Sequence, residues 1–305
     1  GLRLLDLACG SGASTRAHGN IELRGGGNFN RNWPNLTAPL AAKLEGRLTQ
    51  DGAANVALVR AAVLEVLGEI EPRKELDVLR VILSRESLTS DLVLDLHCDD
   101  DSLAHWFTIP EQWPETQDIA AEIGVEAVLL AEDSGGGSFD EFNSLLWYRL
   151  RARFPGHPLP GACVSGTVEF RGQGDVSDEL GSADGAALYR ILARRGYIED
   201  SALPPQPAPR CEATLLSATQ SAKAPVGGIV AYRVVPGDRV RKGDVICEMI
   251  DPAAPPGTPR TPVLAVTDGL VLSRKAFKFL AAGQGLAKIV GTEPLPGRVG
   301  YLLED

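Results

Sequence analysis

In the segment Asp91-Leu-Val-Leu-Asp-Leu-His-Cys98, an apolar run ends at His97 and is followed by the aspartates Asp99 to Asp101. Leucine and valine without strict polar alternation predict a buried strand of a parallel sheet. Open α/β sheets bind ligands beyond the carboxyl ends of their strands. His97 therefore occupies the position of a functional histidine, although a histidine that only caps the strand end fits this stretch equally well.

Helical and strand-like segments alternate on both sides of this stretch. Apolar spacing predicts helices over residues 52–67, 75–86, 115–123, 139–153 and 183–195. Strands are expected at residues 2–8, 106–109, 126–131 and 163–170. The alternation predicts an α/β domain over residues 1–200, with helices on the faces of a sheet.

A proline-rich connector at residues 201–210 separates this domain from a second, all-β domain at 211–305. The second domain resembles the biotinyl/lipoyl-carrier barrel in three pieces, which are Ala224–Val230, Pro236–Asp244 and Ala265–Val271. Carrier domains present a modified lysine in the hairpin between the last two pieces. The corresponding hairpin here, residues 251–262, contains no lysine. We therefore expect a lipoyl-like β-barrel without biotin or lipoate.

Composition excludes several classes of function. The formal net charge of -10 over 305 residues argues against a nucleic-acid-binding face. No apolar stretch is long enough to span a bilayer, so we expect no membrane partner. The five cysteines are scattered and form no CxxC pair, which favours a reducing cytoplasm over a disulfide framework.

The beginning of the chain is unusual. It opens directly in the strand-like run Gly1–Leu7, and its only methionine is Met249. We expect native sequence to precede Gly1. The turn Leu5-Asp-Leu-Ala-Cys-Gly-Ser-Gly12 looks like the first motif of an S-adenosylmethionine-dependent methyltransferase, but the glycine-rich sequence after it is poor helical sequence.

Two further segments carry candidate functional residues. In Gly27-Asn-Phe-Asn-Arg-Asn-Trp-Pro34, the pair Asn30-Arg31 suits recognition of a carboxylate, and a structural Asx turn is the alternative. Glu169 lies near the end of a strand-like run, beside the glycine-rich turn at 172–174. A carboxylate there could act as a general base, or it could be an ordinary strand-edge glutamate in water.

Taken together, Asn28-Phe-Asn-Arg31, Asp95-Leu-His97 and Thr167-Val-Glu169 resemble the succinylglutamate desuccinylase/aspartoacylase family in their order and separation. The resemblance implies a zinc-carboxypeptidase-like mixed sheet flanked by helices. It also implies hydrolysis of the amide bond of an N-acyl amino acid or a related small carboxylate-bearing substrate, and leaves cleavage of an ester as an alternative. It implies that His97 binds Zn²⁺, that Asn30 and Arg31 bind the substrate carboxylate, and that Glu169 is the catalytic base. Two protein ligands in addition to His97 would leave one zinc position open for water.

The family's N-terminal His-x-x-Glu metal motif is missing from this sequence. His18 and Glu22 form the nearest imitation, at a spacing one residue too long. We expect the other two ligands in sequence that precedes Gly1. If the native protein starts at Gly1, the chain would instead be a non-catalytic relative.

Other polar residues near these motifs are weaker candidates for a functional role. His105 could line the pocket or simply pack, and Asp95 could orient a metal ligand or cap a loop. Asp99 to Asp101 could bind a cation, but a solvated loop is the preferred interpretation, and His157 fits a loop residue. Family members often associate, so a homo-oligomer is possible.

Overall fold

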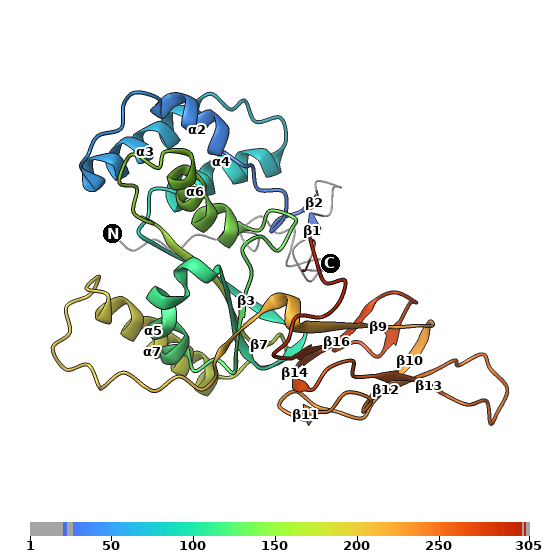
Figure 1. Cartoon of the computed structure of the whole chain (residues 1–305). Helices are drawn as coiled ribbons and strands as arrows, with labels where there is room; N and C mark the ends of the chain where they lie inside the picture. Colours follow the sequence, from blue (N-terminus) through green and yellow to red (C-terminus); the bar gives the residue numbers. More distant parts are fainter. Residues whose placement is uncertain (1–20, 23–26, 301, 303–305) are drawn as a thin grey trace. The chain divides into compact units, whose positions relative to one another are not determined.

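The computed structural model describes residues 21–22, 27–300 and 302, and the chain divides into two compact units (Figure 1). The first unit comprises residues 1–95 and 135–166, and the second comprises residues 96–134 and 167–305. The strand predicted at 2–8 lies outside the described residues. The domain boundaries predicted from composition, at 200 and 210, stay a prediction.

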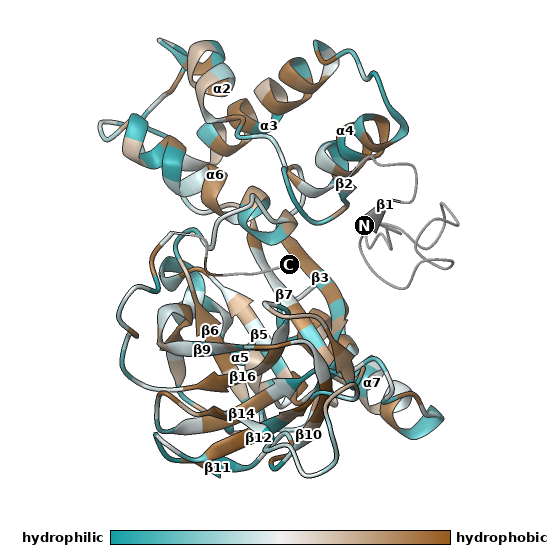
Figure 2. Ribbon diagram, turned by 90° about the vertical axis from the view of Figure 1, so that its right-hand side faces the viewer, coloured by the Kyte–Doolittle hydropathy of each residue, from teal (hydrophilic) through white to brown (hydrophobic). Residues whose placement is uncertain are grey.

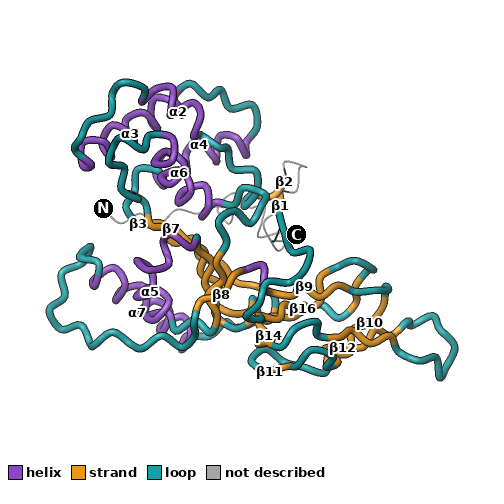
Figure 3. The backbone as a smooth tube through the Cα atoms, in the orientation of Figure 1, coloured by secondary structure: helices purple, strands orange, loops and turns teal. Residues whose placement is uncertain are grey.

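The first unit is mainly helical (Figure 3). Its described residues form two short paired strands, β1 (Ile21–Glu22) and β2 (Gly27–Asn28), and the helices α2 (Thr37–Leu44), α3 (Gly52–Gly68), α4 (Glu75–Ser87) and α6 (Phe139–Arg153). Asp51 caps α3, since its carboxylate accepts hydrogen bonds from the amides of Ala53 at 2.9 Å and Ala54 at 3.2 Å. The core includes Leu40, Val59, Val63, Trp147 and Leu150.

A five-stranded mixed sheet is formed largely by residues of the second unit, although two of its strands begin in the residue ranges of the first. Its order is β3-β7-β5-β6-β8, with β3 (Leu92–Asp99), β7 (Val164–Gly172), β5 (Ala104–Thr108), β6 (Ala127–Leu130) and β8 (Ala213–Leu215). β5 and β6 are parallel, as are β6 and β8, whereas β5 and β7 are antiparallel. The helical elements are η2 (Pro110–Gln112), α5 (Trp113–Ile123), α7 (Asp178–Arg194) and η3 (Leu216–Ala218). The predicted α/β class is confirmed.

The strand that carries His97 differs from its prediction in one respect. Among the residues of β3, only Asp95 is buried, so the prediction of a buried strand is wrong. The physical reason is position: among the described strands, β3 stands at one end of the sheet order, with β7 as its single neighbour.

The C-terminal part of the second unit is all-β, as predicted. Its strands form two antiparallel sheets, β13-β12-β10-β15 and β11-β14-β16-β9. Their bounds are β9 (Thr219–Lys223), β10 (Gly228–Tyr232), β11 (Arg239–Val240), β12 (Val245–Ile250), β13 (Thr261–Leu264), β14 (Gly269–Arg274), β15 (Phe279–Leu280) and β16 (Gly285–Val290). The hydrophobic colouring of these strands in Figure 2 reflects a shared core that includes Val230, Ile246, Met249, Val271 and Ile289. No closed barrel is formed by the hydrogen bonding of the described strands, so the likeness to a lipoyl barrel stays a prediction.

Among the helices of the described residues, none combines the length and the apolar character that crossing a membrane requires.

Candidate functional site

His97 and Glu169 lie near corresponding ends of two neighbouring strands, β3 and β7. The Val164 amide donates to the Asp91 carbonyl at 2.9 Å, and the Gln173 amide donates to the Asp99 carbonyl at 2.8 Å. These two bonds show that β3 and β7 run in the same direction. The structure therefore brings His97 and Glu169, both half-buried, to the carboxyl ends of adjacent parallel strands, where α/β sheets hold their chemistry.

β5 is the neighbour of β7 on the side away from β3, and in this antiparallel pair His105 of β5 is the register partner of Glu169 of β7. Residues paired in this way project from the same face of a sheet. The His105 ring is fully buried, with Nδ1 2.8 Å from the Leu103 carbonyl oxygen and Nε2 4.0 Å from a carboxylate oxygen of Asp99. Of the two interpretations given by the sequence, the structure therefore supports a packed histidine.

Burial lowers the pKa of His105 to about 4, and the positive charge of Lys288 lowers it further, against the opposing effects of Asp99 and the Leu103 carbonyl. The ring is therefore neutral at physiological pH. With its proton on Nδ1, it donates to Leu103 and leaves Nε2 as an acceptor.

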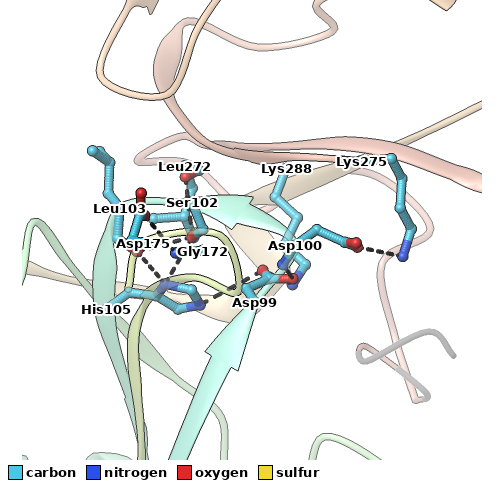
Figure 4. A network of polar contacts seen from close by, with 10 residues as sticks. All are labelled: Asp99, Asp100, Ser102, Leu103, His105, Gly172, Asp175, Leu272, Lys275 and Lys288. Atoms are coloured by element: carbon cyan, nitrogen blue, oxygen red, sulfur yellow. Dashed lines mark hydrogen bonds and ion pairs between the residues drawn. The ribbon is translucent and has the colours of Figure 1, made fainter. Parts of the chain in front are cut away.

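The aspartates after His97 do not form the solvated loop that the sequence suggests. Asp99 pairs with Lys288 at 2.7 Å, and Asp100 pairs with Lys275 at 2.5 Å (Figure 4). Asp101 pairs with Arg274 at 2.6 Å. The prediction of a solvated loop is wrong because cations far away in the sequence neutralise each carboxylate. Burial raises the pKa of Asp99, but the charge of Lys288, the nearby His105 and hydrogen bonds outweigh this effect and hold the pKa well below its usual range.

The loop Asn28–Arg31 belongs to the first unit, and hydrogen bonds fix its shape. The Asn30 amide donates to the side-chain oxygen of Asn28 at 2.8 Å, which forms the Asx turn that the sequence offered as an alternative. Arg80 of α4 donates to the Arg31 carbonyl at 2.7 Å and to the Asn28 carbonyl at 3.4 Å. Arg80 could not be identified from the sequence, because it belongs to no recognisable motif and its place in a predicted helix does not indicate a contact with this loop.

Asn30 connects its loop to two other elements of the first unit. Its side-chain oxygen accepts from the Phe139 amide at the start of α6 at 2.8 Å, and its side-chain nitrogen lies 3.5 Å from a carboxylate oxygen of Asp95 in β3. The Arg31 guanidinium donates back to the Asn30 carbonyl at 2.8 Å. Asn30 and Arg31 thus belong to the first unit, whereas His97 and Glu169 belong to the second.

The described residues do not by themselves fit a zinc ion. They contain no group of three or more His, Cys, Asp or Glu side chains that could hold a metal. His97 is the candidate ligand that this part of the chain supplies. His18 and the methyltransferase-like turn Leu5–Gly12 lie outside the described residues, as does the side chain of Glu22.

No protein-family model and no curated protein matches this sequence. Solved structures do match the fold. A succinylglutamate desuccinylase/aspartoacylase family protein from Shewanella amazonensis is similar at 21% identity and a TM-score of 0.73, over 89% of this chain and 75% of that one. A succinylglutamate desuccinylase/aspartoacylase from Shewanella frigidimarina gives 20% identity and a TM-score of 0.74, over 89% and 73%. The ectoine utilization protein EutE (DoeB) from Ruegeria pomeroyi gives 17% identity and a TM-score of 0.54, over 72% and 64%.

Proposed function

We propose that this chain belongs to a zinc-dependent hydrolase of the succinylglutamate desuccinylase/aspartoacylase family, which cleaves the amide bond of a small N-acyl amino acid or a related carboxylate-bearing substrate. The observation that carries the proposal is the position of His97 and Glu169 at the carboxyl ends of neighbouring parallel strands. The fold shared with structures of that family supports it.

Each candidate residue has a role that its chemistry suits. Arg31 pairs with the substrate carboxylate, while Asn30 holds the loop in place through Phe139 and Asp95. Glu169 accepts a proton from the attacking water and passes it to the leaving amine. His97 is one zinc ligand, and the remaining ligands come from parts of the protein outside the described residues. Bound zinc would polarise the scissile carbonyl and make water more acidic.

The setting of this enzyme is also a proposal. The scattered cysteines favour the cytoplasm. We also propose a homo-oligomer, because members of the family often associate. The C-terminal β region has the predicted carrier-like sequence pieces but no lysine in its 251–262 hairpin, so we assign it no prosthetic group.

The first test measures bound zinc in the protein by elemental analysis. We expect near-stoichiometric zinc in the wild type and in a His157→Ala control, because His157 lies in a loop where its ring contacts the Thr49 carbonyl. His97→Ala should lose the metal. A wild-type protein that takes up no zinc would contradict the proposal and favour a non-catalytic relative.

The second test separates catalysis from metal binding. We expect Glu169→Gln to lower turnover of the best N-acyl amino acid by about 10²- to 10⁴-fold, because a general base contributes that much. Zinc content should stay unchanged, since Glu169 is proposed to move protons and not to bind the ion. Turnover that survives the substitution would remove Glu169 from this role.

A further inference from the structure

Three consecutive aspartates join the end of β3 to the C-terminal sheets within the second unit. Asp99 pairs with Lys288 of β16, and Asp100 pairs with Lys275, the residue after β14 (Figure 4). Asp101 pairs with Arg274 of β14. Adjacent carboxylates repel one another, so three separate cations are needed to neutralise all of them in one conformation. The sequence separations, 173 to 189 residues, show that this pairing is purely tertiary.

Backbone pairing reinforces the ion pairs. Residues 101–102 form a short strand, β4, which pairs with β14 so that Ser102 faces Ser273. The Leu103 amide donates to the Leu272 carbonyl at 3.0 Å, and the Ser102 hydroxyl lies 3.3 Å from the same oxygen. The segment that follows His97 therefore extends one of the C-terminal sheets.

The same segment also holds the end of β7. The Gln173 amide donates to the carbonyls of Asp99 at 2.8 Å and Asp100 at 3.1 Å, and the Gln173 side chain donates to the Asp100 carboxylate at 3.2 Å. Gly172 approaches so closely that a Cβ there would lie 2.9 Å from the Asp100 carbonyl oxygen. Any larger residue at 172 would push the two chains apart.

We propose that the C-terminal β region is a positioning element of the catalytic site, in which Lys288, with Lys275 and Arg274, fixes the ends of β3 and β7 and so fixes the geometry of His97 and Glu169. This inference rests on the proposed function. His97 is two residues before Asp99, and Glu169 is three residues before Gly172. Both therefore lie within three residues of the segments that these ion pairs and backbone contacts hold in place. Lys288 is central because its partner Asp99 also faces His105, the cross-strand neighbour of Glu169.

A positioning role can be distinguished from a merely stabilising one. The side chain of Lys288 is 34% exposed and that of Asp99 is 16% exposed. Removing Lys288 leaves a largely buried carboxylate without its cation, so the free energy of unfolding should also fall. A positioning role is shown by an effect on kcat, and on the local mobility of the strand ends, in a variant that is still folded at the assay temperature.

The experiment compares Lys288→Met with Lys288→Arg and with Lys242→Met, a substitution of an exposed lysine in the same β region. Circular dichroism first establishes that each variant is folded at the assay temperature. We expect Lys288→Met to lower kcat about 10- to 100-fold, because a misplacement of about 1 Å in a catalytic group can cost about 10²-fold in rate. Lys288→Arg should restore most of the loss, and Lys242→Met should behave as the wild type. Equal activity of Lys288→Met and Lys242→Met would overturn the proposal.

A second measurement does not depend on activity. Amide hydrogen exchange should be faster in peptides covering residues 96–103 and 167–173 of Lys288→Met, with the rest of the protein unchanged. Unchanged exchange in these peptides would overturn the proposal. If the wild type binds no zinc and cleaves no N-acyl amino acid, the proposed function fails by itself, and faster exchange would still support the clamp.

Discussion

His105 is a neutral, fully buried histidine, and its burial should make folding sensitive to pH. Its pKa is lowered from 6.5 to about 4 in the folded protein, chiefly by burial and also by Lys288, while Asp99 opposes the shift. Between these two pH values the unfolded chain binds a proton that the folded chain does not. Stability from this residue is therefore complete above about pH 6.5 and is lost as the pH falls towards 4, by roughly 3 kcal/mol in total.

The measurement is the free energy of unfolding from urea titrations between pH 4 and 7, for the wild type and for His105→Asn. Asparagine can keep a donor near the position of Nδ1 for the Leu103 carbonyl, but it does not titrate in this range. Asparagine is smaller than histidine, so the variant should be less stable near pH 7, and the slopes are therefore compared and not the absolute values. Equal slopes for the two proteins would show that His105 does not cause the pH dependence.

The places of two candidate residues could be predicted because the signal was local. His97 and Glu169 lie near the ends of strand-like runs, so their position at the carboxyl ends of strands could be expected, while their roles stay a prediction. The role of Asp99 could not, because Lys288 lies 189 residues further along the chain and no local pattern connects the two. A run of aspartates is usually solvated, and only the tertiary fold reveals the cations that change this outcome.

The loop Asn28–Arg31 and the helix α4 act together at the scale of elements. Arg80 donates to carbonyl groups at both ends of this loop, so it holds the backbone that carries Arg31. We expect Arg80→Met to raise KM for an N-acyl amino acid about 3- to 10-fold with kcat nearly unchanged, because the loop would bind the substrate and its transition state less well to the same extent.

Steady-state kinetics with a matched variant checks this expectation. Arg85 lies on the same helix and is exposed, so Arg85→Met controls for the loss of a positive charge from α4. An unchanged KM in Arg80→Met, or the same change in Arg85→Met, would show that the Arg80 contacts do not support the binding of substrate.

The apolar interiors of the longer helices were predicted closely, whereas one polar helix start and one short helix were missed. The prediction of residues 52–67 matches α3 within one residue, since its buried positions recur at helical spacing. In contrast, α7 begins at Asp178, five residues before the predicted start at 183, because the Ser177 hydroxyl caps it by accepting from the Leu180 amide. α2 was missed altogether, as it is only eight residues long and contains Pro39.

In the whole molecule, the packing of the second unit extends across the proline-rich segment 201–210, because residues 96–134 and 167–305 form one compact unit. The domain boundary that composition predicts at this segment stays a prediction. Composition reports local stiffness and polarity, whereas the contacts of residues 99–103 with β14 and β16 are long-range. These contacts lead us to expect that the mixed sheet and the C-terminal sheets unfold together.

Gly269→Ala tests this cooperativity. A Cβ at Gly269, the first residue of β14, would lie 2.3 Å from the Val290 carbonyl oxygen, so the strand must shift and the protein should lose about 1–3 kcal/mol of stability. Gly285→Ala is the control, because a Cβ at this position in the neighbouring strand β16 meets no atom within 4 Å.

Amide hydrogen exchange then reports which strands open. If the second unit is cooperative, Gly269→Ala should lower protection to a similar extent in β5, at residues 104–108, and in β12, at residues 245–250. The fall should be about 5- to 150-fold for a loss of 1–3 kcal/mol, since 1.4 kcal/mol corresponds to a factor of ten. A fall confined to β12 would mean that the C-terminal sheets open independently. In that case the ion pairs of Asp99 to Asp101 would not couple the two parts strongly enough for one to position the other.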